Sequence, residues 1–141
     1  MIKPNKLKFT DIKIGDSAEF EITVTETMVH QFANISGDFN SLHMDNEFAK
    51  TTKFGKRVCH GMLLGSFFSR LVGMYIPGLN ALYLSQSLKF ISPCFIDDKI
   101  IVRGTVIRKS ERTKIITLQT LILNTNDKIL VDGECKAVVL V

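Results

Sequence analysis

The first quarter of the chain alternates apolar and polar positions before its period changes. In the stretch 16–25 (DSAEFEITVT), apolar side chains occupy every second position from Ala18 to Val24. A period of two is typical of a strand that buries one of its faces. We therefore predict a half-buried strand over Asp16–Thr25.

A helical period replaces the alternation after this strand. Thr25 predicts an N-cap, because its hydroxyl can accept a hydrogen bond from a free N–H group of the first turn. Apolar side chains then recur at helical spacing: Val29, Phe32 and Ala33. We expect the helix to end near Gly37. A loop is predicted from Asp38 to His43, followed by a short helix over Asp45–Lys50 with an acidic first turn that suits the helix dipole.

The segment Gly61–Tyr75 (GMLLGSFFSRLVGMY) is apolar around nearly the whole circumference of a helix, and Arg70 is its single charge. Helices with this pattern are usually buried. The glycines of the segment lower its helix propensity but permit close packing against a sheet. Pro77 and Gly78 predict its end. We expect a central helix that is buried on nearly every face.

Strand-type composition fills the rest of the chain. Four stretches rich in strand-forming residues are separated by turn-forming residues; they are Ala81–Ile91, Lys99–Arg108, Lys114–Asn124 and Lys128–Leu140. Short connections of this kind suit successive antiparallel neighbours. The order of elements predicts an α+β fold in which an antiparallel sheet wraps the central helix. The length of 141 residues suits one domain, 1–141.

Composition and charge exclude several classes of protein. The chain is 45% hydrophobic and 23% charged, as in ordinary globular proteins. We find no apolar run long enough for a membrane span and no apolar leader, so we expect a cytoplasmic location. The net charge of +4 comes from scattered lysines. This distribution argues against nucleic-acid binding and is compatible with an anionic small ligand.

The cysteines Cys59, Cys94 and Cys135 are widely spaced and odd in number. Their spacing fits neither a disulfide framework nor a zinc site, so we expect free thiols in or near the core and no bound metal. Cys59 adjoins His60, and a catalytic thiol there is the weaker alternative.

One polar cluster departs from this ordinary pattern. The stretch 36–45 (SGDFNSLHMD) places Asp38, Asn40 and His43 within six residues. A folded-back loop would aim the carboxylate and the imidazole at one point, where the pair can take a proton from water and give a proton to a substrate carbon. Taken alone, Asp38 is more often a turn residue and His43 a packed histidine. Their joint spacing favours a hydro-lyase.

A second feature is the pair His60-Gly61, which directly precedes the predicted central helix. The first N–H groups of a helix have no intrahelical partner, and the helix dipole adds positive potential there. The N–H of Gly61 would bind an enolate-like oxygen, and such a donor typically lowers the barrier by about 2.7–4 kcal/mol. His60 itself is expected to be a packed histidine. Ser69, in the same helix, is expected by default to bond a carbonyl of the preceding turn.

These residues carry a family resemblance. The motif GDFNSLHMD, the later VCHGM and the segment YLSQSLKFISPCFIDDKI resemble the MaoC-like, R-specific enoyl-CoA hydratases of the hot-dog fold, in their short single-domain form. The similarity extends from about Lys8 to Leu140. The loop pattern of the family is D-x-N-P-[LI]-H, and Ser41 stands here in place of the proline. Proline would restrict φ, whereas serine reaches the same conformation at an entropic cost of about 1 kcal/mol or less.

The resemblance implies a reaction and roles for five residues. The reaction is the reversible syn hydration of trans-2-enoyl-CoA to (R)-3-hydroxyacyl-CoA, without a metal or redox cofactor. Asp38 and His43 would be the catalytic pair that activates water, and Gly61 would bind the thioester oxygen. Asn40 would support the loop beside the substrate, and Ser69 would lie near the site. The implied fold is a strongly curved antiparallel sheet around the central helix, and homodimers are usual in the family.

Three other functions stay open at this point. A 3-hydroxyacyl-ACP dehydratase would work in the opposite direction, removing water from a carrier-protein thioester to give enoyl-ACP, and a positive patch at the pocket mouth would favour such an acidic carrier. A hot-dog acyl-CoA thioesterase would not need the Asp38/His43 pair, and a non-catalytic acyl-CoA-binding module would need no acid–base pair. The sequence does not predict the preferred acyl chain length. Apolar candidates for the pocket floor are Leu63, Phe67, Met74, Leu84 and the segment Ile76-Pro77.

Overall fold

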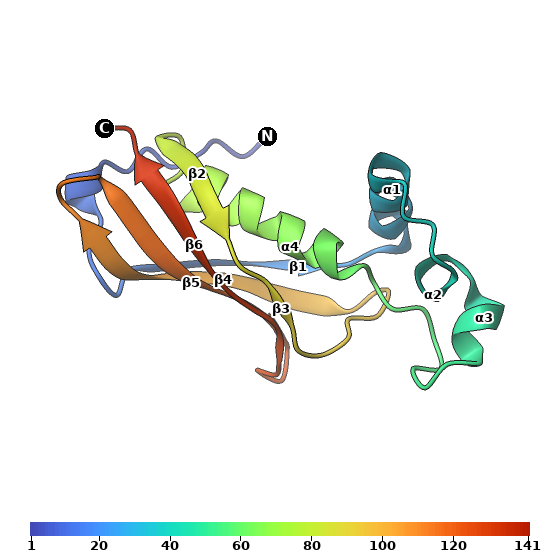
Figure 1. Cartoon of the computed structure of the whole chain (residues 1–141). Coiled ribbons are helices and arrows are strands. Elements are labelled where there is room, and N and C mark those ends of the chain that lie inside the picture. Colours follow the sequence, from blue (N-terminus) through green and yellow to red (C-terminus); the bar gives the residue numbers. More distant parts are fainter.

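The strand-type stretches pair into one curved antiparallel sheet in the computed structural model, which describes residues 1–141 (Figure 1). The strands are β1 (Ser17–Thr23), β2 (Ala81–Gln86), β3 (Lys89–Phe90), β4 (Lys99–Ser110), β5 (Ile115–Asn124) and β6 (Ile129–Val139). Their order across the sheet is β1-β4-β5-β6-β2, and β3 also pairs with β6. The predicted α+β arrangement of a sheet around a helix is confirmed, with two differences among the strands.

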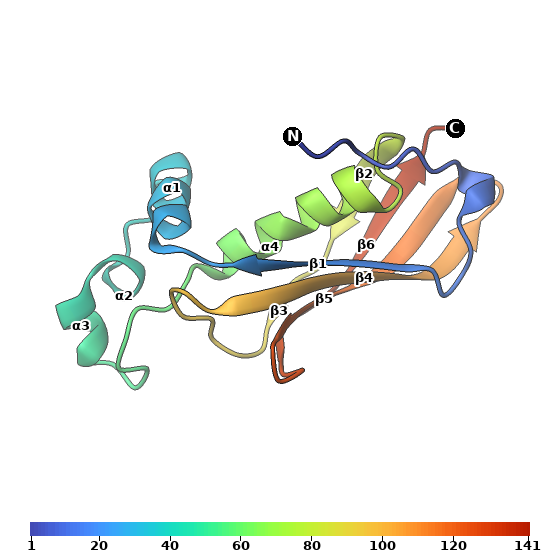
Figure 2. The same ribbon diagram turned by 180° about the vertical axis from the view of Figure 1, so that it is seen from behind.

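The first difference is that the predicted strand Ala81–Ile91 divides into β2 and β3. The second is that β2 lies beside β6 and not beside β4, the next long strand in the sequence. The other edge of β4 is occupied by β1, where Phe20 opposes Val102 and Ile22 opposes Ile100 (Figure 2). The successive pairs β4–β5 and β5–β6 are antiparallel, as predicted.

Four α-helices lie between β1 and β2: α1 (Glu26–Ser36), α2 (Ser41–Met44), α3 (Asn46–Lys50) and α4 (Gly61–Arg70). A short 3-10 turn, η1, precedes β1 at Phe9–Asp11. The predicted cap of α1 is present, because the Thr25 hydroxyl accepts a hydrogen bond from the Met28 N–H at 3.2 Å. Gly37 ends α1 in the left-handed conformation, with φ of 80°, which glycine adopts without strain.

The loop predicted over residues 38–43 is partly helical, which corrects the prediction. The helix α2 begins at Ser41, because the Asn40 side chain accepts a hydrogen bond from the Leu42 N–H at 3.0 Å and so caps a free donor. Asp45 caps α3 in the same way, through the N–H groups of its first turn. Two side-chain caps in succession therefore fold this polar stretch back on itself.

The helix α4 lies on the concave side of the sheet (Figures 1 and 2). Its inward side chains Leu64 and Phe68 are buried in the main apolar cluster, together with Leu71 just beyond its end. Full burial of such a side chain stabilises the fold by roughly 1.5–3 kcal/mol. Gly104 on β4 permits this contact, since a Cβ there would lie only 2.7 Å from a methyl group of Leu71.

The outward side of α4 corrects a second prediction. Met62, Ser66 and Ser69 are exposed in the single chain, so the helix is not buried on nearly every face. The sheet curves around one side of the helix only, and no other element covers the opposite side. After Arg70 the backbone continues as a π-helical turn, η2, over Leu71–Tyr75.

No helix in this structure combines the length and the apolar character that a membrane crossing requires.

Candidate active site

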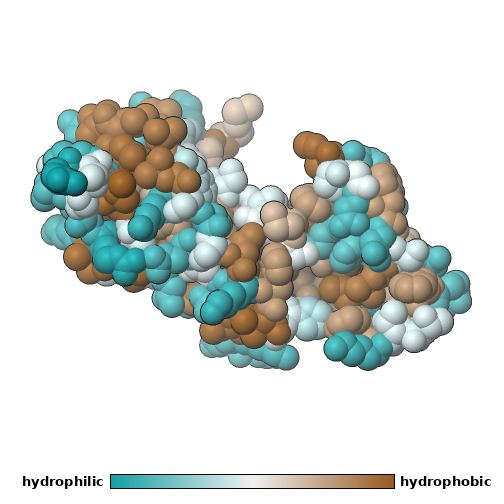
Figure 3. All heavy atoms as spheres, in the orientation of Figure 1, coloured by the Kyte–Doolittle hydropathy of each residue, from teal (hydrophilic) through white to brown (hydrophobic).

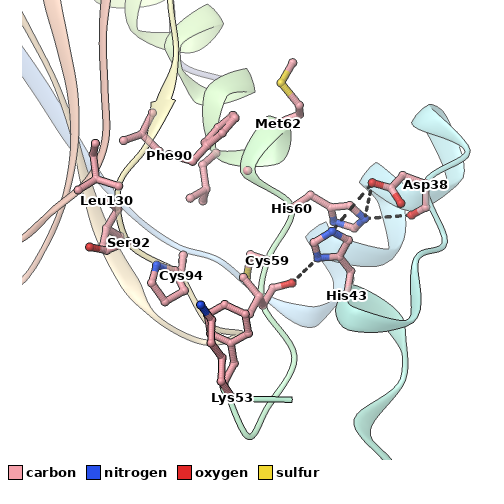
Figure 4. A pocket seen from close by; sticks show the side chains of 17 residues that line it. Asp38, His43, Lys53, Cys59, His60, Met62, Phe90, Ser92, Cys94 and Leu130 are labelled. Atoms are coloured by element: carbon pink, nitrogen blue, oxygen red, sulfur yellow. Dashed lines mark hydrogen bonds and ion pairs between the residues drawn. The ribbon is translucent and has the colours of Figure 1, made fainter. Parts of the chain in front are cut away.

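Asp38, His43 and His60 come together near the N-terminal end of α4 (Figure 4). The Oδ2 atom of Asp38 lies 4.0 Å from Nε2 of His43 and 4.0 Å from Nε2 of His60. The two imidazole rings face each other with centroids 4.1 Å apart. The structure thus brings the predicted carboxylate–imidazole pair together and adds a second histidine to it.

Local hydrogen bonds orient the Asp38 side chain. Its Oδ1 accepts a hydrogen bond from the Asn40 N–H at 3.1 Å, and its own N–H donates to the Ser36 hydroxyl at 3.1 Å. This Asx turn leaves Oδ2 directed toward the histidines. One carboxylate oxygen of Asp38 therefore stabilises the turn, and the other faces the two imidazole rings.

The tautomer of His43 follows from its contacts. Its Nδ1 lies 2.6 Å from the carbonyl oxygen of Val58. A carbonyl oxygen only accepts, so Nδ1 carries the hydrogen, and in the neutral ring Nε2 keeps a lone pair on the side of Asp38. Two acceptors 4.0 Å apart do not bond directly. A single water molecule can donate one O–H to each of them.

His60 is the N-cap residue of α4, and only 2% of it is exposed. Its Nε2–H donates to the carbonyl oxygen of Asp38 at 3.0 Å, while its buried Nδ1 has no hydrogen-bond partner. Burial lowers the pKa of His60 below the usual 6.5, and the neighbouring His43 and Arg57 act in the same direction, against the opposing hydrogen bond and charge of Asp38. His60 is therefore neutral at pH 7, and it fixes the backbone at Asp38.

The lowered pKa of His60 predicts how stability depends on pH. As the pH falls through 6.5, residue 60 takes up a proton in the unfolded chain but not in the folded protein. The unfolded state then binds more protons, so the free energy of unfolding decreases with falling pH. His60→Gln should flatten this decrease. Urea unfolding of both proteins across this pH range measures the effect, and identical pH profiles would contradict the prediction.

Gly61 is the first residue of α4, and its N–H donates to no backbone carbonyl. It borders a cavity of about 500 Å³ together with Asp38 and His43. The ring of Phe90 from β3 lies against it, and a Cβ at residue 61 would be 2.8 Å from that ring. Glycine at this position therefore allows the Phe90 ring to pack directly beside the free N–H group of residue 61.

The walls of this cavity are largely apolar. They are formed by the segment before α4 and the N-terminal end of that helix, by β3 and the segment after it, and by β6. The apolar residues other than cysteine are Phe54, Val58, Met62, Leu64, Phe90, Ile91, Pro93, Leu130 and Val131. None of the residues suggested for the pocket floor borders this cavity, so their contact with an acyl chain stays a prediction. The cavity runs from the start of α4 toward the sheet and not along the length of the helix.

The other sequence candidates lie outside the cavity. Asn40 caps α2 and so supports the loop, but it does not border the cavity. Ser69 lies on the exposed side of α4. Contact of either residue with a substrate stays a prediction. Ser41 occupies the first position of α2, where proline is well tolerated, which accounts for proline in the loop pattern of the family.

Cys59 and Cys94 also border the cavity, and all three cysteines are free and buried, as predicted. Contact with Cys59 and burial raise the pKa of Cys94 far above its usual range. The thiol of Cys94 therefore stays protonated at neutral pH and is a poor nucleophile.

Asp38, His43 and His60 offer possible metal-ligand atoms that lie within 4.8 Å of one another. The donor set fits a metal poorly, because the hydrogen on His60 Nε2 is already directed to the Asp38 carbonyl. A water molecule that donates to Asp38 and His43 can occupy the space between these side chains and leaves the hydrogen bond from His60 to the Asp38 carbonyl intact.

Comparison with known proteins gives matches over most of the chain. The family model for the MaoC like domain matches residues 9–127. An (R)-specific enoyl-CoA hydratase of Rhodospirillum rubrum is 37% identical over 131 residues, which are 93% of this chain and 90% of the relative. A mitochondrial 3-hydroxyacyl-[acyl-carrier-protein] dehydratase of Arabidopsis thaliana is 35% identical over 132 residues, 92% of this chain and 78% of that protein.

Among solved structures, an (R)-hydratase from A. caviae involved in PHA biosynthesis has a TM-score of 0.88 and 38% sequence identity. The alignment covers 91% of this chain and 97% of that chain.

Proposed function

Because this chain belongs to the MaoC-like family, we propose that it is a hydro-lyase that adds water reversibly to trans-2-enoyl-CoA and forms (R)-3-hydroxyacyl-CoA. The observation that carries the proposal is the geometry at Asp38. Its Oδ2 lies 4.0 Å from the lone pair-bearing Nε2 of His43, beside the free N–H of Gly61. An acid–base pair next to an oxyanion donor is the arrangement that hydration of an unsaturated thioester requires.

The proposed reaction is a balanced transfer of one water molecule. Asp38 and His43 hold the water, and the pair takes a proton as the water oxygen bonds to C3 of the substrate. The electrons of the double bond move to the thioester oxygen, where the N–H of Gly61 stabilises the negative charge. The pair then returns a proton to C2 on the same face. The pair ends as it began, and the addition is syn.

Neutral His60 fits this scheme. A charged imidazolium at residue 60 would bind the Asp38 carboxylate and compete with the water for it. Burial keeps His60 uncharged, so its contribution is the hydrogen bond to the Asp38 carbonyl. Hydration moves protons and changes no net oxidation state, so the proposed reaction needs no redox cofactor.

A carrier-protein thioester is the second candidate substrate, and the relative from Arabidopsis thaliana favours it. Lys53 borders the cavity, and Lys50 and Lys56 lie on the same segment of the chain. These cations suit the phosphates of coenzyme A and equally the acidic surface of a carrier protein. We place coenzyme A first because the relatives from R. rubrum and A. caviae are R-specific hydratases.

One assay separates the candidate functions. We expect crotonyl-CoA to lose its ultraviolet absorbance, the product to be the R enantiomer, and a thiol reagent to detect no free coenzyme A. Faster turnover of the matching carrier-protein thioester would favour the dehydratase. Thiol release without hydration would identify a thioesterase, and binding without any absorbance change would identify a binding module.

We also propose that two copies associate through β2. This strand is an edge of the sheet, and exposed edges with unpaired N–H and C=O groups favour pairing. Apolar residues are exposed on and near it: Leu79, Leu82, Leu84 and Leu140. In Figure 3 the apolar spheres gather over β2 and the end of β6, beside the exposed side of α4. A solution mass of twice 15.8 kDa is the expected result.

The cytoplasmic location of the protein stays a prediction.

A further inference from the structure

Arg57 is a buried cation next to the candidate active site, and only 6% of it is exposed. Its Nε donates to the main-chain carbonyl of His43 at 2.6 Å, and its Nη1 donates to Glu26 Oε1 at 2.8 Å. Its Nη2 is buried without a hydrogen-bond partner. Burial of a guanidinium with an unpaired nitrogen is costly, so stability alone is a weak reason for an arginine at this position.

Arg57 and Val58 hold residues 42 and 43 through three hydrogen bonds. Besides the Arg57 bond, the Val58 N–H donates to the Leu42 carbonyl at 3.2 Å. The Val58 carbonyl accepts the Nδ1–H of His43 at 2.6 Å. One dipeptide therefore holds both the main chain and the ring of His43, and the position of Nε2 relative to Asp38 depends on both contacts.

The helix α2 needs such support. It has four residues, too few to be stable alone, and the carbonyl groups of its last turn have no intrahelical donor. No backbone N–H donates to the carbonyl of His43. The guanidinium of Arg57 satisfies this oxygen and so holds the end of the helix that carries the imidazole.

Glu26, in the first turn of α1, orients the guanidinium from its other side. The hydrogen bond and the charge of Arg57 lower the pKa of Glu26, so this carboxylate is ionised at neutral pH. The Glu26–Arg57–His43 contacts thus connect α1 to α2 across the segment that contains Asp38.

We propose that Arg57 is a positioning residue that holds His43 at the distance from Asp38 needed for water activation, an inference that rests on the proposed function. Arg57 borders no part of the cavity and does not act on the substrate itself. Its loss should therefore change the rate of the chemical step more than the binding of the substrate.

The test compares Arg57→Met and Arg57→Lys with the control Arg103→Met. Arg103 also donates to a glutamate, Glu19 at 2.7 Å, but it lies on β4, away from the site.

A displacement of about 1 Å at a catalytic group can lower the rate by about 10²-fold. We expect Arg57→Met to lower kcat for crotonyl-CoA by about 10- to 100-fold with little change in KM. Arg57→Lys should lose less, since an ammonium keeps the charge but does not reproduce the fork of donors. The control should match the wild type.

A second readout does not require activity. The Nδ1–H of His43 should give a downfield, slowly exchanging proton signal in NMR spectra of the wild type, because its bond to Val58 is short. Arg57→Met should broaden this signal or speed its exchange, whereas Arg103→Met should leave it unchanged. If the wild type hydrates no thioester, the proposed function fails, and the NMR comparison still decides the role of Arg57.

Two results would overturn the proposal. One is a folded Arg57→Met protein with the wild-type kcat and an unchanged His43 signal. The other is a loss of activity that only follows the unfolded fraction, with kcat per folded molecule unchanged. If Arg57→Met does not fold, Arg57→Lys and Glu26→Gln take its place, and wild-type kcat in both of them would equally overturn it.

Discussion

Asp38→Asn is expected to lower kcat for crotonyl-CoA hydration by about 10³-fold, within the roughly 10²- to 10⁴-fold contribution of a general acid–base group. An amide does not take a proton from water at neutral pH, so the pair loses its carboxylate. The fold should persist, because the asparagine Oδ1 can still accept the Asn40 N–H that shapes the turn. Initial rates, together with a thermal melt of each protein, measure both effects.

Asp45→Asn is the matched control for this change. Asp45 is also a capping aspartate in the same stretch, where its Oδ1 accepts the N–H groups of Glu47 and Phe48. It does not border the cavity, and we expect a near-normal rate. A near-normal rate for Asp38→Asn would refute the catalytic role. Equal losses in the two variants would indicate that the shape of the loop, and not the carboxylate of Asp38, controls the rate.

The second large effect concerns the backbone N–H of Gly61. Replacement by proline removes this donor, and proline suits the first position of a helix. The preceding residue, His60, has φ of −56° and ψ of 130°, a conformation that a following proline accepts. Loss of one oxyanion donor typically lowers kcat by about 10²- to 10³-fold. We expect a loss of this size from Gly61→Pro.

The ring of Phe90 requires a matched background for this experiment. Any Cβ at residue 61 would lie 2.8 Å from the ring, so both substitutions are made with Phe90→Ala. Gly61→Ala then adds a Cβ and keeps the N–H, whereas Gly61→Pro adds a Cβ and removes it. The ratio of the two kcat values isolates the donor. Equal kcat values would show that this N–H does not stabilise the transition state.

The local part of the site could be read from the sequence because its partners are close along the chain. Asp38 and His43 are five positions apart, and short-range caps at Asn40 and Asp45 fold the stretch between and beyond them. The free N–H of Gly61 follows from its place at the start of a helix. These features depend on local hydrogen bonds, which sequence patterns indicate well.

The remaining features depend on contacts between distant segments. The bond from His60 to the Asp38 carbonyl joins residues 22 positions apart, and the bond from Arg57 to Glu26 joins residues 31 positions apart. In the sequence Arg57 is one more cation in a lysine-rich segment. The exposure of one side of α4 could not be predicted from the sequence either. It depends on how far the sheet curves around the helix and not on the pattern of apolar residues in the helix.

The central claim is that Asp38 and His43 act together on one water molecule. The kcat of the double variant Asp38→Asn/His43→Gln, compared with those of the two single variants, tests it most directly. When two groups form one catalytic unit, removal of the second costs little once the first is gone. We predict that the double variant is about as slow as the slower single variant. Losses that multiply would show that the two residues act independently, and would contradict this account.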